Sequence, residues 1–303
     1  MNLAPIVLFV YNRPWHTQQT VKALQKNELA DLSDLFIYSD GPKDDQSQET
    51  VQKVRKYIHT IDGFKTLTVQ KREKNLGLAN SIISGVTEIV NKYDRIIVLE
   101  DDITTSPYFL RYMNDALNFY QDEERIMHIS GYMFPVNYIG LQETFFYRVT
   151  SCWGWATWSR AWKYFKKDVK WVYQIFSKEE RRAFNLDGSH NFWSQVEGNK
   201  LGKLNSWAIF WYASVFKNQG LCLHPCQSLT NNIGHDGSGI HCGNSKKFTV
   251  SPIDKPISYF ETSIKEDQLA LARMKSFYRR HDGNIIQRLA GSLKQKCFYN
   301  AVH

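Results

Sequence analysis

The chain has 303 residues, a formal net charge of +8, 43% hydrophobic residues and 22% charged residues. These values are ordinary for a soluble globular protein, and the length allows one long α/β domain or two domains. No stretch reaches the roughly 18 apolar residues of a membrane span. The apolar stretch at residues 6–10 is short and has no basic flank before it, so we expect a strand there, not a signal peptide.

The excess of positive charge favours anionic partners such as nucleotides, nucleic acid or a phospholipid surface. Residues 273–303 contain seven Lys and Arg residues and a single acidic residue, Asp282. This segment could lie on an anionic bilayer or form a solvated helical face. Nine Trp and sixteen Tyr residues suit sugar rings or, alternatively, an aromatic-rich core.

The five cysteines are odd in number and form no C-x-x-C pair, which indicates reduced thiols in a cytoplasmic protein. A zinc site made of Cys222, His224 and Cys226 is a weaker alternative.

Strands and helices alternate in the first half. Apolar runs predict strands at 4–11, 35–39, 66–71 and 96–99, and periodic segments predict helices at 14–26, 46–61 and 78–91. This order predicts a mostly parallel sheet. The second half is less regular, with helices expected at 107–120, 177–184 and 206–218, strands at 126–130, 145–149 and 221–223, and a polar loop at 231–243.

The fourth strand ends in three consecutive carboxylates, Glu100, Asp101 and Asp102. Hard divalent cations prefer oxygen ligands, and ligands of open α/β sheets bind at the carboxyl ends of strands. The sequence therefore predicts a metal site. The alternative is a surface turn in which Asp102 or Thr104 caps the helix that starts near Pro107.

Loops after the other strands reach the same edge of the predicted sheet. They begin at Tyr11, Asp40 and Arg72. An aromatic ring can stack on a base, a carboxylate can accept its N–H, and a cation can bridge phosphates. Together these groups favour a nucleoside diphosphate.

The stretches at 7–13, 39–41, 75–79 and 99–102 resemble the nucleotide-sugar half of GT-A fold glycosyltransferases, of the family 2 and N-acetylglucosaminyltransferase I types. The stretches at 153–158, 206–209 and 232–242 are similar to a bacterial branch associated with surface polysaccharides. The resemblance covers about residues 4–245. It implies a GT-A catalytic domain at 1–250, with a nucleotide-sugar half (1–104) and an acceptor half (105–250), and a helical basic extension at 251–303.

The resemblance also implies roles for individual residues. Tyr11, Arg13 and Asp40 would contact the base, expected to be uracil. Asp102 would be the main metal ligand, and His241 would reach the metal or the diphosphate, unless it is only a loop histidine bonded to backbone. The implied donor-site residues are Tyr11, Asn12, Arg13, Asp40, Arg72, Asn75, Gly77, Glu100 and Asp101.

Transfer of a sugar also requires a base that takes the proton of the acceptor hydroxyl. The position at which the family usually carries this base is Asn205, and an amide cannot take a proton, so Asp236 is the favoured candidate and Glu197 the other. The Trp-rich stretch would supply a sugar platform, with core packing as the alternative. The expected platform residues are Trp153, Gly154, Trp155 and Trp207.

These features predict a metal-dependent inverting glycosyltransferase of the hexosyl or N-acetylhexosaminyl class. It would use Mn²⁺ or Mg²⁺ and a nucleotide sugar, expected to be a UDP-sugar. The acceptor would be a glycan or a lipid-linked oligosaccharide of a bacterial lipopolysaccharide or capsule, at the inner face of the cytoplasmic membrane and without nucleic acid. The alternatives are a sugar-phosphate nucleotidyltransferase and a non-catalytic glycan-binding protein.

Overall fold

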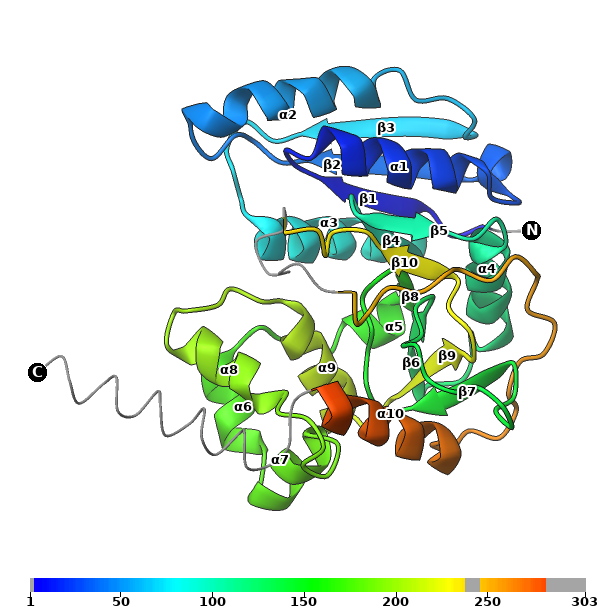
Figure 1. Cartoon of the computed structure of the whole chain (residues 1–303). Helices are drawn as coiled ribbons and strands as arrows, with labels where there is room; N and C mark the ends of the chain where they lie inside the picture. Colours follow the sequence, from blue (N-terminus) through cyan, green and yellow to red (C-terminus); the bar gives the residue numbers. More distant parts are fainter. Residues whose placement is uncertain (1–2, 238–245, 282–303) are drawn as a thin grey trace, which may run out of the picture.

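The computed structural model describes residues 3–237 and 246–281 (Figure 1). Within them, an eight-stranded sheet has the order β3-β2-β1-β4-β8-β6-β9-β7. Six strands run in one direction, and β8 and β7 run against them. The strands are β1 (Ile6–Val10), β2 (Asp34–Ser39), β3 (Thr66–Lys71), β4 (Arg95–Glu100), β6 (Ile126–Ser130), β7 (Thr144–Tyr147), β8 (Trp155–Trp158) and β9 (Leu221–Pro225). The mostly parallel α/β sheet predicted from the sequence is confirmed.

Helices cover both faces of this sheet, which explains why β1 and the apolar part of β4 are buried throughout. One face packs against α1 (Pro14–Gln25), α2 (Asp45–Ile58) and α4 (Phe109–Phe119). The other face packs against α3 (Leu78–Tyr93), α5 (Ser159–Trp162) and α9 (Ala208–Lys217). The helices predicted in the first half lie within three residues of these bounds.

A small second sheet was missed by the sequence prediction. It pairs β5 (Ile103–Thr105) antiparallel with β10 (Thr230–Asn232), so that Asn232 lies opposite Ile103. Thr104 is therefore a strand residue and not a helix cap, and α4 begins at Phe109 without a side-chain cap. The pairing brings the chain after residue 230 to the acids that follow β4.

The Trp-rich stretch forms β8, which inserts antiparallel between β4 and β6. Trp155 is fully buried and stacks on Trp207, with ring centroids 5.4 Å apart. The expected role of Trp155 as a sugar platform is wrong, because both faces of a central strand are covered. Gly154 is also a packing residue: with φ +77, it brings the backbone against Phe109 and Thr230.

A third core lies beyond the sheet, where helices gather beside α9 (Figure 1). It contains α6 (Val169–Ile175), α7 (Lys178–Phe184), α8 (Trp193–Lys200) and α10 (Gln268–His281). Of these only α7 was predicted as a separate helix. Helix α10 buries Ala270, Leu271 and Met274 in this core, and Ile257 packs with the main sheet. Among the residues described, no helix is long and apolar enough to cross a membrane.

Candidate functional site

A cavity of about 610 Å³ lies at the carboxyl ends of β1, β2 and β4. Its wall at this edge includes Tyr11, Asn12, Arg13, Asp40, Lys43, Asn75, Gly77, Glu100, Asp101 and Asp102. The opposite wall includes Cys152, Trp153, Gln195, Leu204, Asn205, Ser206, Trp207 and Ala208. The volume is that of a typical ligand or cofactor site. Most of the predicted donor residues therefore border one cavity.

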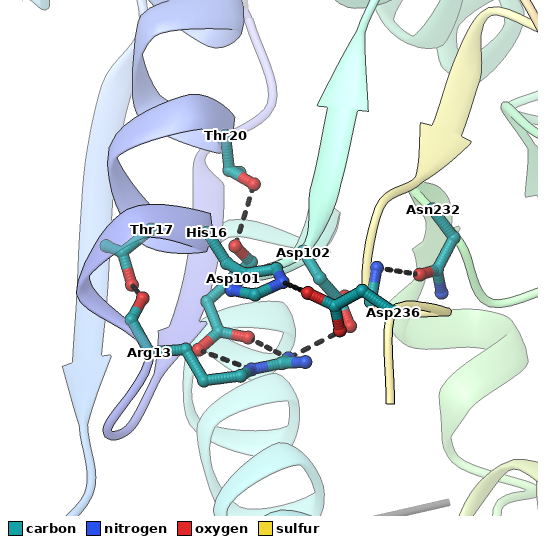
Figure 2. Close-up of polar contacts among 9 residues, drawn as sticks. Arg13, His16, Thr17, Thr20, Asp101, Asp102, Asn232 and Asp236 are labelled. Atoms are coloured by element: carbon teal, nitrogen blue, oxygen red, sulfur yellow. Dashed lines mark hydrogen bonds and ion pairs between the residues drawn. The ribbon is translucent and has the colours of Figure 1, made fainter. Parts of the chain in front are cut away.

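Arg13 is the cation that faces the acids after β4 (Figure 2). Its guanidinium forms an ion pair with Asp101 and a second ion pair with Asp102, in which Nη2 is 2.9 Å from Oδ2. The hydroxyl of Thr20 donates to the carbonyl of Asp101 at 2.8 Å, and the hydroxyl of Thr17 donates to the carbonyl of Arg13 at 2.9 Å. Helix α1 thus fixes both the cation and the backbone that carries the acids.

The cluster has more acidic groups than Arg13 balances. Burial, together with the charges of Asp102 and Asp101, raises the pKa of Glu100. Burial also raises the pKa of Asp101, although the nearby Arg13 opposes this rise. Glu100 is thus held toward its neutral form, and the carboxyl groups of Asp101 and Asp102 against one guanidinium still leave a negative excess where a cation would be stabilised.

Asp40 organises the loop that precedes α3. Its carboxylate accepts the backbone N–H groups of Gly41, Leu76 and Gly77, each at 2.9 Å. Asn75 donates to the carbonyl of Gly41 at 2.8 Å, which ties the two loops together. Gly77 has φ +73, a conformation that glycine adopts readily. Asp40 therefore positions this wall of the cavity, in addition to any contact with a base.

Arg72 differs from its predicted position. Its guanidinium carbon lies 5.4 Å from the centroid of the Tyr38 ring, and its side chain is not part of the cavity wall. The implied place of Arg72 in the donor site is therefore not supported. Lys43 is a wall residue that no sequence motif predicted. It lies close to Tyr11, whose hydroxyl accepts the Lys43 backbone N–H at 3.2 Å.

The chain after β10 lies over the acids (Figure 2). The N–H of Ile233 donates to the carbonyl of Asp102 at 2.9 Å. At Gly234 an added Cβ atom would overlap Asp102 Oδ2, so any other residue here would require Asp102 or this loop to shift. Asp236 Oδ2 is 3.0 Å from His16 Nε2, which links this loop to α1.

Neither candidate base lines the cavity. Asp236 pairs with His16 and is not on the cavity wall, and Glu197 is exposed on α8 and is also absent from it. Asn205 is on the wall and accepts a hydrogen bond from Lys167. Among the described residues, the carboxylates on the wall are Asp40 and the three after β4, all at the strand edge.

Trp153 and Trp207 of the expected platform border the cavity, and the ring centroid of Trp153 is 5.2 Å from that of His235. Gln195 also borders the cavity and could not be predicted, since a single helical glutamine carries no recognisable signal in the sequence. His241 lies outside the described residues.

The described part of the chain contains no group of three His, Cys, Asp or Glu side chains arranged to hold a metal ion. The zinc alternative is therefore not supported: both ring nitrogens of His224 lie near backbone carbonyls, and Cys222 is buried. Asp102 and Asp101 offer oxygen ligands with a negative excess, which fits a hard divalent cation.

No protein-family model matches the sequence, and no curated protein matches it. Solved structures with a similar chain path include glycosyltransferases, the class that the sequence motifs resemble. Mannosyltransferase PcManGT from Pyrobaculum calidifontis, in complex with GDP-Man and Mn²⁺, is 9% identical over 72% of this chain and 69% of that chain, with a TM-score of 0.40. Residues 1–349 of S. aureus TarS are 14% identical over 77% of this chain and 61% of that chain, with a TM-score of 0.42.

A longer S. aureus TarS chain is 19% identical over 41% of this chain, with a TM-score of 0.30, and the match spans about a fifth of its own length (21%). These identities and TM-scores are too low to assign a function to this chain.

Proposed function

We propose that the protein is a metal-dependent glycosyltransferase that uses a nucleotide diphosphate sugar. The single observation that carries this proposal is the cavity in which Glu100, Asp101 and Asp102 meet Arg13 at the end of β4. The diphosphate of such a donor is stabilised by cationic groups, here Arg13 and a metal ion. The acids after β4 supply the excess of negative charge that holds such a metal ion.

The donor is proposed to extend along the cavity from the base to the sugar. Tyr11 can stack on the base, and Asp40 holds the Gly77 turn beside it. Arg13 can release part of its ion pair to a phosphate oxygen. Asp102, with Asp101, would hold the divalent cation, proposed to be Mn²⁺ or Mg²⁺. A bound cation supplies charge stabilisation for the diphosphate leaving group.

We further propose that the donor is a UDP-sugar and that a hexosyl or N-acetylhexosaminyl group is transferred with inversion. The proposed acceptor belongs to a bacterial surface glycan such as a lipopolysaccharide or capsule. We also propose that residues 1–250 form a GT-A catalytic domain and that residues 251–303 form an extension.

A peripheral position on the inner face of the membrane is supported by one surface. Arg279 and Arg280 are exposed at the end of α10, and Leu269 is exposed at its start. Ile139 is 73% exposed, and its carbonyl accepts a hydrogen bond from Arg273 of the same helix. Apolar side chains beside basic ones suit the interface of an anionic bilayer.

A nucleotidyltransferase is less well supported, because the chain after β1, Tyr11-Asn12-Arg13-Pro14, is not a glycine-rich phosphate loop. A glycan-binding protein without catalysis would not need the buried acids.

The test is the thermal stabilisation of the protein by UDP, GDP, CDP and dTDP, each with and without Mn²⁺. A ligand that binds only the native state raises the melting temperature. We expect a shift with UDP that requires Mn²⁺. The absence of a shift with every nucleotide would contradict the proposal.

A further inference from the structure

A smaller cavity of about 190 Å³ adjoins the large one. The two share the wall residues Cys152, Trp153, Gln195 and Ala208. The smaller cavity extends from these residues to Phe134, Val149, Thr150, Ser151, Phe192, Ile209, Tyr212 and Tyr278. A group bound there would touch whatever fills the adjoining end of the large cavity.

The order of the strands shows which end that is. The sheet runs β2-β1-β4-β8, and the base-side residues follow β2 and β1 while the acids follow β4. Trp153 precedes β8, and Gln195 and Ala208 come from α8 and α9 beyond it. The small cavity thus joins the large one at the end remote from the base. With the nucleotide placed as proposed above, this is the sugar end.

The two cavities differ in charge. The wall of the large one carries Arg13, Lys43 and four carboxylates, whereas none of the described residues on the small wall is charged. A phosphate or carboxylate placed in the small cavity would lose hydration without gaining a counter-ion. The wall therefore selects a neutral occupant.

The wall also combines aromatic surface with polar groups. Phe192, Tyr212 and Tyr278 offer ring surface against which the C–H face of a sugar packs. The side-chain amide of Gln195 has no hydrogen bond with any of the described residues, so its donors and acceptor are available for hydroxyl groups. A purely hydrocarbon occupant would leave this amide unused.

We propose that the small cavity is the acceptor subsite and that it binds an uncharged pyranose residue of the acceptor. This inference rests on the proposed function. Reaction requires the acceptor oxygen to be about 3–3.5 Å from the carbon it attacks, which only a site adjoining the sugar end allows. The acceptor is therefore a neutral sugar unit of a glycan, and not a phosphate or an anionic sugar.

The experiment is saturation-transfer NMR on the full chain with UDP and Mn²⁺ present. The probes are the methyl pyranosides of glucose, galactose, mannose and N-acetylglucosamine, with glycerol 3-phosphate as the anionic comparison. The variants are Gln195→Leu and Gln195→Ala, and Gln52→Leu, an exposed helical glutamine on α2, is the matched control. Thermal stabilisation by UDP is measured for every protein.

We expect a signal from at least one pyranoside with the wild type and with Gln52→Leu, and a several-fold weaker signal with both Gln195 variants. The inference is overturned if no pyranoside binds while UDP does, if the signal survives in both Gln195 variants, or if glycerol 3-phosphate displaces the pyranoside. Failure of UDP to bind the wild type would instead overturn the proposed function, so the two failures are distinguishable.

Discussion

The two ends of the large cavity are built in different ways. The base end consists of short loops that directly follow parallel strands, and it is held by ion pairs and by backbone N–H groups that converge on Asp40. The other end consists of Trp153 and residues of α8 and α9, with uncharged side chains supported by a large aromatic core. A nucleotide needs the fixed charges of the first end, whereas a neutral sugar needs only shape and a few polar groups.

The largest effect is expected at Asp102, at the end of the cavity that carries the fixed charges. Asp102→Asn keeps the shape but removes the charge proposed to hold the cation, and we expect roughly a 100-fold or greater loss of Mn²⁺-dependent UDP affinity and of transfer. Titration calorimetry with UDP and Mn²⁺ measures this loss. Asp122→Asn, an exposed change after α4, is the control. An affinity equal to that of wild type would remove Asp102 from the metal site.

The core behind the sugar end predicts a pH dependence of stability. His128 is buried, donates from Nε2 to the Ser151 carbonyl at 2.9 Å and accepts from Trp211 Nε1 at 3.1 Å at its Nδ1. Burial lowers the pKa of His128 to about 3 and that of His224 to about 4. The unfolded chain therefore binds more protons than the native one below pH 6.5, so stability falls as the pH falls from about 6.5 toward 4.

Each of these histidines lowers the free energy of unfolding by about 2 kcal/mol when the pH falls from 7 to 5. Urea denaturation at pH 7.5, 6 and 5 measures this loss. His128→Gln should flatten part of the dependence, and the exposed His59→Gln is the control for the loss of an imidazole. The same slope in His128→Gln and wild type would contradict the prediction.

A change at Gly234 tests the contact between the chain after β10 and Asp102. In Gly234→Ala the new Cβ would overlap Asp102 Oδ2, and such overpacking costs about 1–3 kcal/mol. We expect about a tenfold loss of Mn²⁺-dependent UDP affinity, measured by calorimetry. Gly188→Ala, which strains the backbone at φ +84 without a clash, is the control. Full UDP affinity in Gly234→Ala would show that Asp102 can move freely.

The smallest expected effect concerns the outer surface, away from both ends of the cavity. Arg279→Gln should weaken binding to vesicles that contain phosphatidylglycerol by about fivefold, since each basic residue near such a surface contributes about 1 kcal/mol. Vesicle sedimentation measures this. The control is Lys22→Gln, at a lysine that is exposed on α1. Equal losses in both variants would indicate a general charge effect and refute the α10 surface.

The base end could be predicted from the sequence to a large extent. Val7, Leu8 and Val98 belong to continuous apolar runs, and a run of this kind followed by polar residues marks both a buried parallel strand and the edge at which it ends. Even there, the sequence did not reveal that Arg13 would lie on Asp101 and Asp102, or that Arg72 would turn to Tyr38. Side-chain partners depend on the distances between loops.

The sugar end was predictable to a much smaller extent. Trp155 and Trp153 are two residues apart, but one stacks inside the sheet and the other borders the cavity. The antiparallel insertion of β8 decides between them, and it depends on pairings between segments about 30 to 60 residues apart. The sequence thus determined the parallel strands, their order along the chain and the acids at the end of β4, because local hydrophobic patterns encode them. Only the tertiary structure decided that Gln195, Tyr212 and Tyr278 border one cavity, because long-range packing alone brings these three together.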